Sequence, residues 1–121
     1  MSATILIIDD DDQLRRSFER LLTDEDYTVL GAPSGETGLQ IIQAKMPDLV
    51  ILDMIMPGMG GGEVFERIKE MNPDVKVLLA SGYSVTSQIT NILDRGCGGF
   101  MQKPFNMGRL SQKIRDVLEG R

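Results

Sequence analysis

Short runs of consecutive apolar residues alternate along the chain with segments whose apolar residues recur three or four positions apart. The uninterrupted runs predict strands that are buried on both faces, and the spaced segments, such as Leu14, Phe18, Leu21 and Leu22, predict amphipathic helices. The predicted strands cover residues 4–8, 27–32, 49–52, 75–80 and 100–102. The pattern is therefore five strand–helix units in succession.

Residues that favour helix ends support the same division. Ser34 and Asn106 each stand just before a helical segment, where a short polar side chain caps free backbone N–H groups. Pro47 ends the second helix and Gly96 the fourth. Strands that alternate with helices indicate an α/β fold with a parallel sheet between two helical layers, and five units favour an open three-layer sandwich over a closed barrel.

The length of 121 residues and the lack of any linker predict a single domain over residues 1–121. The formal charge of −5 and the absence of a long basic block argue against nucleic-acid binding by this chain. One cysteine, Cys97, and no long apolar run or secretory leader predict a cytoplasmic protein without membrane contact. Since the chain has no histidine, its chemistry must come from carboxylates, hydroxyls and lysine.

Polar residues follow four of the five predicted strands. Asp9 and Asp10 follow the first strand, Asp53 the third, Ser81 the fourth and Lys103 the fifth. Because ligands bind at the carboxyl ends of strands in open parallel sheets, we expect these side chains to lie at one edge. Each residue alone is as readily a turn or cap residue, and only their coincidence at this edge favours a site.

The carboxylates at this edge predict a divalent metal ion. Clustered like charges raise one another's pKa unless a cation intervenes, and ligands that are all oxygen suit Mg²⁺. A carboxylate beside a metal and a lysine is also equipped to act as a nucleophile toward phosphorus. Asp11 and Asp12 we interpret as caps of the following helix, and the glycine-rich residues 58–62 as a flexible loop, since they lack the spacing of a phosphate-binding loop.

Four segments together resemble the receiver domain of two-component response regulators, over the whole chain. They are Ile-Leu-Ile-Ile-Asp-Asp at 5–10, Leu-Val-Ile-Leu-Asp-Met-Ile-Met-Pro-Gly at 49–58, Val-Leu-Leu-Ala-Ser-Gly at 77–82 and Phe-Met-Gln-Lys-Pro-Phe at 100–105. The resemblance implies a flavodoxin-like (βα)5 fold, as in chemotaxis regulators, with strand order 2-1-3-4-5. It also implies that Asp53 is the phosphoacceptor, and that Asp10, Asp53 and the backbone carbonyl of Ile55 hold Mg²⁺, with Asp9 assisting through a water.

The resemblance further implies a conformational switch. Ser81 and Lys103 match the family's phosphate-contacting pair, and Phe100 matches an aromatic residue that turns inward on activation. The Lys103–Pro104 bond matches a peptide that is usually cis in the family. Ser81 stands where Thr is frequent and Phe100 cannot make the hydroxyl contacts of a Tyr, while Tyr83 matches a position that tunes the loss of the phosphoryl group, as Ile55 does.

The function predicted from the resemblance is a phosphorylation-dependent signalling switch. A histidine kinase or phosphotransfer protein would supply the phosphoryl group, the domain would catalyse its own phosphorylation and slow dephosphorylation, and the signal would pass to a downstream protein or a fused domain. Residues 80–84 and 99–105 look more like receivers fused to hybrid sensor kinases than like those joined to DNA-binding domains. Two alternatives stay open: a constitutive interaction module and a flavin or nucleotide binder of the same architecture.

Overall fold

A computed structural model describes residues 3–82, 87–94, 97–103 and 106–120. Their centre is a five-stranded sheet in which every pairing is parallel and the strand order is β2-β1-β3-β4-β5, so the predicted topology is confirmed. The strands are β1 (Thr4–Ile8), β2 (Thr28–Ala32), β3 (Leu49–Asp53), β4 (Lys76–Ser81) and β5 (Gly99–Gln102). The helices are α1 (Asp12–Asp24), α2 (Gly35–Lys45), α3 (Gly61–Met71), α4 (Ser87–Asp94) and α5 (Met107–Glu119).

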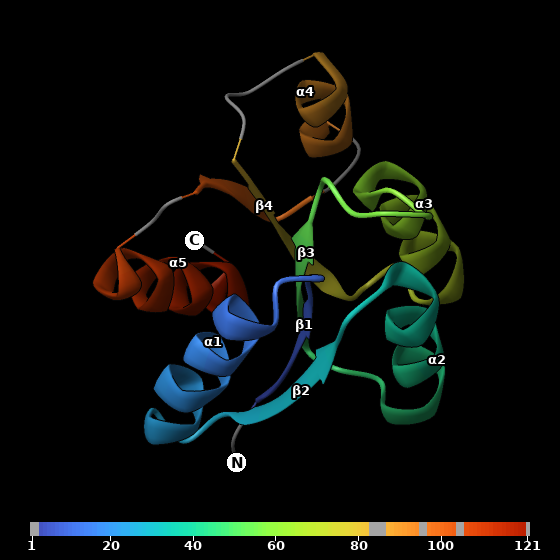
Figure 1. Ribbon diagram of the computed structural model, residues 1–121. Helices are drawn as coiled ribbons and strands as arrows, with labels where there is room; N and C mark the ends of the chain where they lie inside the picture. Colours follow the sequence, from blue (N-terminus) through green and yellow to red (C-terminus); the bar gives the residue numbers. More distant parts are fainter. Residues whose placement is uncertain (1–2, 83–86, 95–96, 104–105, 121) are drawn as a thin grey trace.

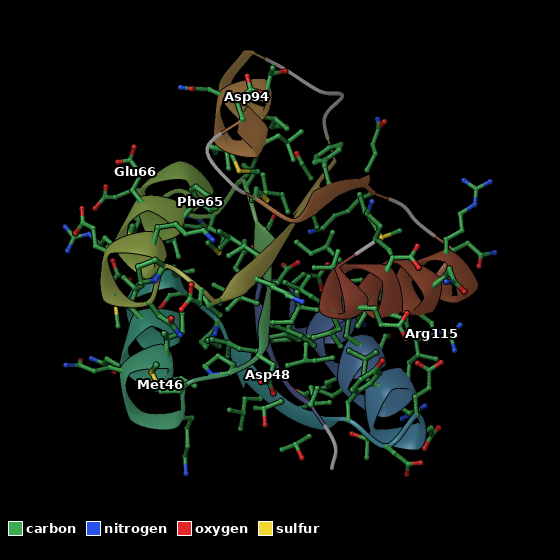
Figure 2. All side chains as sticks on the ribbon, turned by 180° about the vertical axis from the view of Figure 1, so that it is seen from behind. Met46, Asp48, Phe65, Glu66, Asp94 and Arg115 are labelled. Carbon is green, nitrogen blue, oxygen red and sulfur yellow. The ribbon has the colours of Figure 1, made fainter. Side chains whose placement is uncertain are left out.

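The helices form two layers that cover opposite faces of the sheet (Figure 1). On one face α1 and α5 lie side by side, and on the other lie α2, α3 and α4. Alternate residues of a strand serve the two layers, as in β1, where Ile5 and Ile7 pack against α1 and α5 while Leu6 and Ile8 pack against the opposite layer. In Figure 2, Phe65 lies on the buried side of α3 and Glu66 on its exposed side. The sheet therefore has a separate apolar core on each face.

Three of the helix caps expected from the sequence are present, whereas Asp12 does not cap α1 but is its first residue and pairs with Arg15. Asp11 caps α1 by accepting hydrogen bonds from the N–H groups of Gln13 and Leu14. Ser34 caps α2 by accepting from the N–H of Thr37, and Asn106 caps α5. Strand boundaries differ from the predicted ones by no more than one residue at either end, the usual uncertainty where a strand meets a turn.

Three further predictions concern Cys97, membrane contact, and residues near the ends of β4 and β5. Cys97 is half-buried, and its Sγ donates to the carbonyl oxygens of Val77 at 3.2 Å and Gly99 at 3.3 Å, so it fills space beside the sheet and is tied to it. Among the described residues, every helix is too short or too polar to cross a membrane. The predictions for Tyr83 and for the peptide that precedes Pro104 lie outside the described residues.

The register of the sheet places the predicted site residues at one edge. Asp53, the last residue of β3, pairs with Ala80, the residue before Ser81. Ser81 in turn pairs with Gln102, the residue before Lys103. Because all strands run in the same direction, their carboxyl ends gather the polar residues that the sequence distributes over the chain.

Candidate functional site

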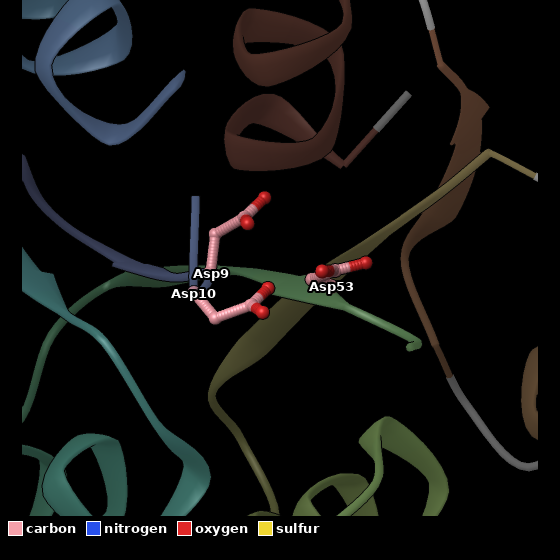
Figure 3. Close-up of side chains that lie close together, drawn as sticks. All are labelled: Asp9, Asp10 and Asp53. Carbon is pink, nitrogen blue, oxygen red and sulfur yellow. The ribbon is translucent and has the colours of Figure 1, made fainter. Parts of the chain in front are cut away.

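Three carboxylates form a cluster at the carboxyl edge of the sheet. Asp9 and Asp10 follow β1 directly and Asp53 ends the neighbouring β3, so the three side chains lie close together (Figure 3). One carboxylate oxygen from each residue lies within 4.8 Å of those of the other two. Asp9 and Asp53 are 2% and 5% exposed, whereas Asp10 is open to solvent. The cluster therefore has two buried members and one exposed member, all offering hard oxygen ligands.

Lys103 is the cation of this cluster. Its Nζ donates a 2.8 Å hydrogen bond to Oδ2 of Asp9 and lies 3.5 Å from Oδ1 of Asp53. The backbone N–H of Lys103 donates to the carbonyl oxygen of Ser81 at 2.6 Å, which continues the β4–β5 pairing and holds the lysine at the edge. The structure thus brings together Asp9, Asp10, Asp53 and Lys103 as the sequence predicts.

The ionisation of Asp53 reflects this environment. Burial and the neighbouring charge of Asp9 raise the pKa of Asp53 to about 6, although Lys103 and the N–H of Ile55 act in the opposite direction. For Lys103, burial acts to lower the pKa, but its hydrogen bond to Asp9 and the charge of Asp53 outweigh burial, so the pKa is raised. At neutral pH the site accordingly holds an ionised Asp53 facing a protonated lysine.

Backbone N–H groups orient the two buried carboxylates. The N–H of Asp11 donates to Oδ1 of Asp9 at 2.9 Å, and the N–H of Ile55 donates to Oδ1 of Asp53 at 3.3 Å. Both bonds link a side chain to the backbone two residues ahead, as in an Asx turn. Ile55 itself is 57% exposed beside the site. The binding of Mg²⁺ by its backbone carbonyl oxygen stays a prediction.

Of the two predicted switch residues, Ser81 lies at the sheet edge that carries the cluster, and Phe100 lies in β5 two positions before that edge. Ser81 is buried at the end of β4, one position past the residue that pairs with Asp53. Phe100 in β5 is partly buried and packs against the core that α2, α3 and α4 form with the sheet. The position of Ser81 suits a contact with a group on Asp53. The conformational change expected of Phe100 stays a prediction.

The sequence predicts a flexible loop over residues 58–62, but this is wrong for its last two residues, because Gly61 and Gly62 begin α3. The sequence predicts no role for Arg15 at the site. Gly61, at the start of α3, lies so close to β3 that a Cβ atom on it would lie 2.6 Å from the Cα of Met54 and 2.8 Å from the carbonyl oxygen of Asp53. Only glycine fits there, so part of the glycine-rich segment serves close packing behind Asp53. Arg15 donates to the carbonyl oxygen of Asp9 at 2.8 Å and to Asp12 at 2.6 Å. The spacing of Asp12 and Arg15 indicates the second contact, but no sequence pattern indicates the first.

The fold and site together define a doubly wound α/β protein with an acidic centre and a lysine at the carboxyl edge of its sheet. The chain belongs to the family of the response regulator receiver domain, which matches residues 5–115. It is 32% identical to the sensor kinase CckA of Brucella abortus over 120 residues, and 33% identical to the response regulator MprA of Mycobacterium ulcerans over 118 residues. Each match covers 98% of this chain.

Solved structures agree with this assignment. A CheY-like receiver domain protein from Methanospirillum hungatei has a TM-score of 0.94 and 29% identity, with coverage of 99% of this chain and 96% of that one. NtrX from Brucella abortus has a TM-score of 0.92 and 30% identity, with coverage of 99% of this chain and 28% of NtrX. The chain spans 13% of the length of CckA and 51% of the length of MprA. The similarity therefore concerns a receiver module that these relatives combine with further parts.

Proposed function

We propose that residues 1–121 form a phosphorylation-dependent signalling switch in which Asp53 accepts a phosphoryl group from a histidine kinase or phosphotransfer protein. The observation that carries this proposal is the placement of the Asp53 carboxylate, buried beside two further carboxylates and 3.5 Å from the Nζ of Lys103. A site that only capped a helix or formed a turn would not require an acidic cluster and a cation drawn from three different strand ends.

The donor set of the cluster fits Mg²⁺. Three carboxylates within 4.8 Å of one another are hard oxygen ligands, and two of them are shielded from water. Asp10, Asp53 and the backbone carbonyl of Ile55 would hold the ion together with waters, and Asp9 would assist through one of these waters. Bound Mg²⁺ would offset the negative charge that gathers on the phosphoryl oxygens during transfer.

The protein groups have distinct roles in the proposed transfer. A carboxylate oxygen of Asp53, ionised because its pKa of about 6 lies below neutral pH, attacks the phosphorus of a phosphohistidine. A bond forms between this oxygen and phosphorus while the bond between phosphorus and the imidazole nitrogen breaks, and that nitrogen keeps the electron pair. Lys103 places its ammonium near Asp53, where it would meet an oxygen of the incoming group. Later attack of water on phosphorus would restore the carboxylate.

The response of the domain would begin at Ser81 and Phe100. The hydroxyl of Ser81, at the strand end next to Asp53, would move toward a phosphoryl oxygen. Phe100 lies two residues before Gln102, which pairs with Ser81, and would follow that movement inward. The altered surface of α4, β5 and α5 would then bind a downstream protein or a fused domain with a different affinity.

Intact-protein mass spectrometry with acetyl phosphate and Mg²⁺ tests the phosphoacceptor. We expect the wild-type protein to gain the mass of one phosphoryl group and Asp53→Asn to gain none. Asp24→Asn, which removes an aspartate at the far end of α1, is the matched control and should gain one group. Wild-type protein that gains no mass, or an Asp53→Asn variant that gains as much, would overturn the assignment. Excess EDTA should suppress the reaction in wild type.

A binding measurement separates the switch from a constitutive interaction module. The affinity for the phosphodonor kinase or an output domain is measured with and without acetyl phosphate, for wild type and for Ser81→Ala. We expect phosphorylation to change the affinity of wild type and to change that of Ser81→Ala much less, because the variant lacks the hydroxyl that would contact the phosphoryl group. Equal affinities in both states of the wild type would support the constitutive module.

A further inference from the structure

Arg15 closes the acidic turn between β1 and α1. The residue lies in the first turn of α1, and its side chain is only 16% exposed. Its guanidinium uses two nitrogens on different partners: Nη1 donates to the backbone carbonyl oxygen of Asp9 at 2.8 Å, and Nη2 donates to Oδ1 of Asp12 at 2.6 Å. A planar group with fixed donors that spans two points of one turn limits how that turn can rotate.

The peptide group that Arg15 binds joins Asp9 to Asp10. On its amino side, Asp9 is held by the sheet, because its N–H donates to the carbonyl oxygen of Ala32 at 3.1 Å. The side chain of Asp9 is held as well, by Lys103 and by the N–H of Asp11. The Asp9 carbonyl is part of the peptide group that leads from these fixed points to Asp10. The orientation of this peptide group sets the direction in which the Asp10 side chain leaves the backbone.

The Asp10 carboxylate depends on the backbone for its orientation. It is exposed, and among the described residues no hydrogen bond or ion pair to its side chain fixes its position. It nevertheless places an oxygen within 4.8 Å of the oxygens of Asp9 and Asp53. An exposed carboxylate with free rotation of the preceding peptide would lose entropy to adopt this position, so a fixed peptide plane favours the cluster.

The neighbouring strand leaves room for the arginine side chain. Gly31 of β2 pairs with Ile7 of β1, two positions before Asp9. A Cβ atom on Gly31 would lie 2.5 Å from Oε1 of Glu19, and it would be in van der Waals contact with Arg15, 3.5 Å from Cδ and 3.6 Å from Nε. The side chains of Glu19 and Arg15 therefore both lie over the bare backbone of the edge strand, and the guanidinium reaches the Asp9 carbonyl from there.

We propose that Arg15 is a positioning residue that directs the Asp10 carboxylate into the metal-binding cluster. This inference rests on the proposed function, because it takes the cluster of Asp9, Asp10 and Asp53 as the Mg²⁺ site. The charge of Arg15 acts in the opposite sense, since a fixed cation next to a cation site repels the ion. Removal of Arg15 therefore weakens Mg²⁺ binding if the residue acts by orientation, and strengthens it if the residue acts by charge alone.

Calorimetric titration of the unphosphorylated full chain with MgCl₂ distinguishes these outcomes. Arg15→Met keeps most of the apolar stem and removes the donors, and Arg16→Met is the matched control, because Arg16 is the exposed arginine next to it. We expect the dissociation constant of Arg15→Met to rise roughly tenfold, as for other groups that orient metal ligands. Arg16→Met should change it less than about twofold. Arg15→Lys, which retains one donor, should give an intermediate value.

A double-mutant cycle tests whether the effect passes through Asp10. If Arg15 acts by orienting Asp10, then Arg15→Met should not weaken Mg²⁺ binding any further in an Asp10→Asn background, where only the effect of its charge remains. An equal loss in both backgrounds would show that Arg15 acts elsewhere and would overturn the inference. Far-UV circular dichroism and urea unfolding establish that each variant is folded, and Arg15→Lys takes the place of Arg15→Met in the cycle if the latter is not.

The outcomes separate this inference from the proposed function. If wild type binds Mg²⁺ and Asp53→Asn does not, but Arg15→Met binds as tightly as wild type or more tightly, only the inference on Arg15 is wrong. If wild type shows no Mg²⁺ binding that depends on Asp53, the proposed metal site is wrong and the role of Arg15 falls with it.

Discussion

The Nζ of Lys103 lies 2.8 Å from Oδ2 of Asp9, across 94 positions of the chain. The carboxylate is almost fully buried, and the lysine is mostly so. The contact joins the end of β5 to the end of β1, and the same ammonium lies 3.5 Å from Asp53. Since Asp9 and Asp53 share this one cation, the Lys103 ammonium contributes both to the stability of the domain and to the charge balance of the proposed phosphorylation site.

Removal of this cation should destabilise the metal-free domain. Lys103→Met leaves the buried Asp9 without its ion pair, and we expect the free energy of unfolding in EDTA to fall by about 2 kcal/mol. Saturating Mg²⁺ should restore part of the loss, because it supplies positive charge to the same carboxylates. Urea unfolding in EDTA and in MgCl₂ measures both effects. Lys45→Met, at an exposed position in α2, should change little, and an Mg²⁺-independent loss in Lys103→Met would contradict this account.

The raised pKa of Asp53 predicts a particular pH dependence of stability. The pKa is about 6 in the folded protein against 3.8 for an ordinary aspartate, so the folded state binds the proton more tightly than the unfolded state. Proton binding by Asp53 therefore stabilises the folded state. This stabilisation is fully present below pH 3.8 and is lost as the pH rises through about 6.

Asp53→Asn should therefore be more stable than wild type at pH 7.5 in EDTA, by up to about 3 kcal/mol. The difference should shrink as the pH falls through 6 and should be small near pH 4. Paired urea titrations of the two proteins at each pH isolate the contribution of Asp53, since the other groups are common to both. A difference that does not vary with pH would show that the carboxylate is not destabilised by its surroundings.

Asp10 and Asp11 should respond to substitution in opposite ways. Asp11→Ala removes the cap that accepts from Gln13 and Leu14, so we expect a loss of about 1 kcal/mol in stability and little change in Mg²⁺ affinity. Asp11→Asn should retain the cap and the stability. Asp10→Asn, at an exposed position, should leave stability nearly unchanged and weaken Mg²⁺ binding. Urea unfolding and calorimetry read the two properties separately, and a loss of Mg²⁺ binding in Asp11→Ala would make that residue part of the metal site.

A contact remote from the site should affect stability alone. The Oγ of the buried Ser111 lies 2.5 Å and 2.8 Å from the two carboxylate oxygens of Glu25, and so joins α5 to the end of α1. Ser111→Ala should cost about 1 to 2 kcal/mol, because a hydrogen bond to a charged acceptor is lost in a partly buried place. Ser17→Ala, which removes an exposed bond to the backbone of its own helix, should cost much less. Phosphorylation by acetyl phosphate should be unchanged in both variants.

Much of the fold follows from local sequence features. The alternation of apolar runs with helical spacing predicts every strand and helix in order, and the caps Asp11, Ser34 and Asn106 mark where three helices begin. These features act over a few residues, so a single sequence displays them. The strand order needed a further step, the resemblance to receiver domains, because the pattern does not state which strands are neighbours.

The site was predictable as a set of residues, and less so as a geometry. Asp9, Asp10, Asp53 and Lys103 were identifiable because each follows a strand, and parallel strands present their carboxyl ends at one edge. The contact between Arg15 and the carbonyl of Asp9 was not identifiable, because a long side chain has many rotamers and any carbonyl is an acceptor. The same holds for Gly61, whose close approach to β3 depends on how α3 packs.

The amino-acid sequence by itself determined the succession of strands and helices and put an acidic or basic side chain at the right strand ends, because periodicity and capping are local properties of the chain. Only the tertiary structure decided that Lys103 pairs with both Asp9 and Asp53, that burial and the charge of Asp9 raise the pKa of Asp53 to about 6, and that Arg15 binds the carbonyl oxygen of Asp9 in the turn before Asp10. Those properties depend on distances and burial between segments far apart in the chain, which arise when the sheet register and the packing of both helical layers are fixed together.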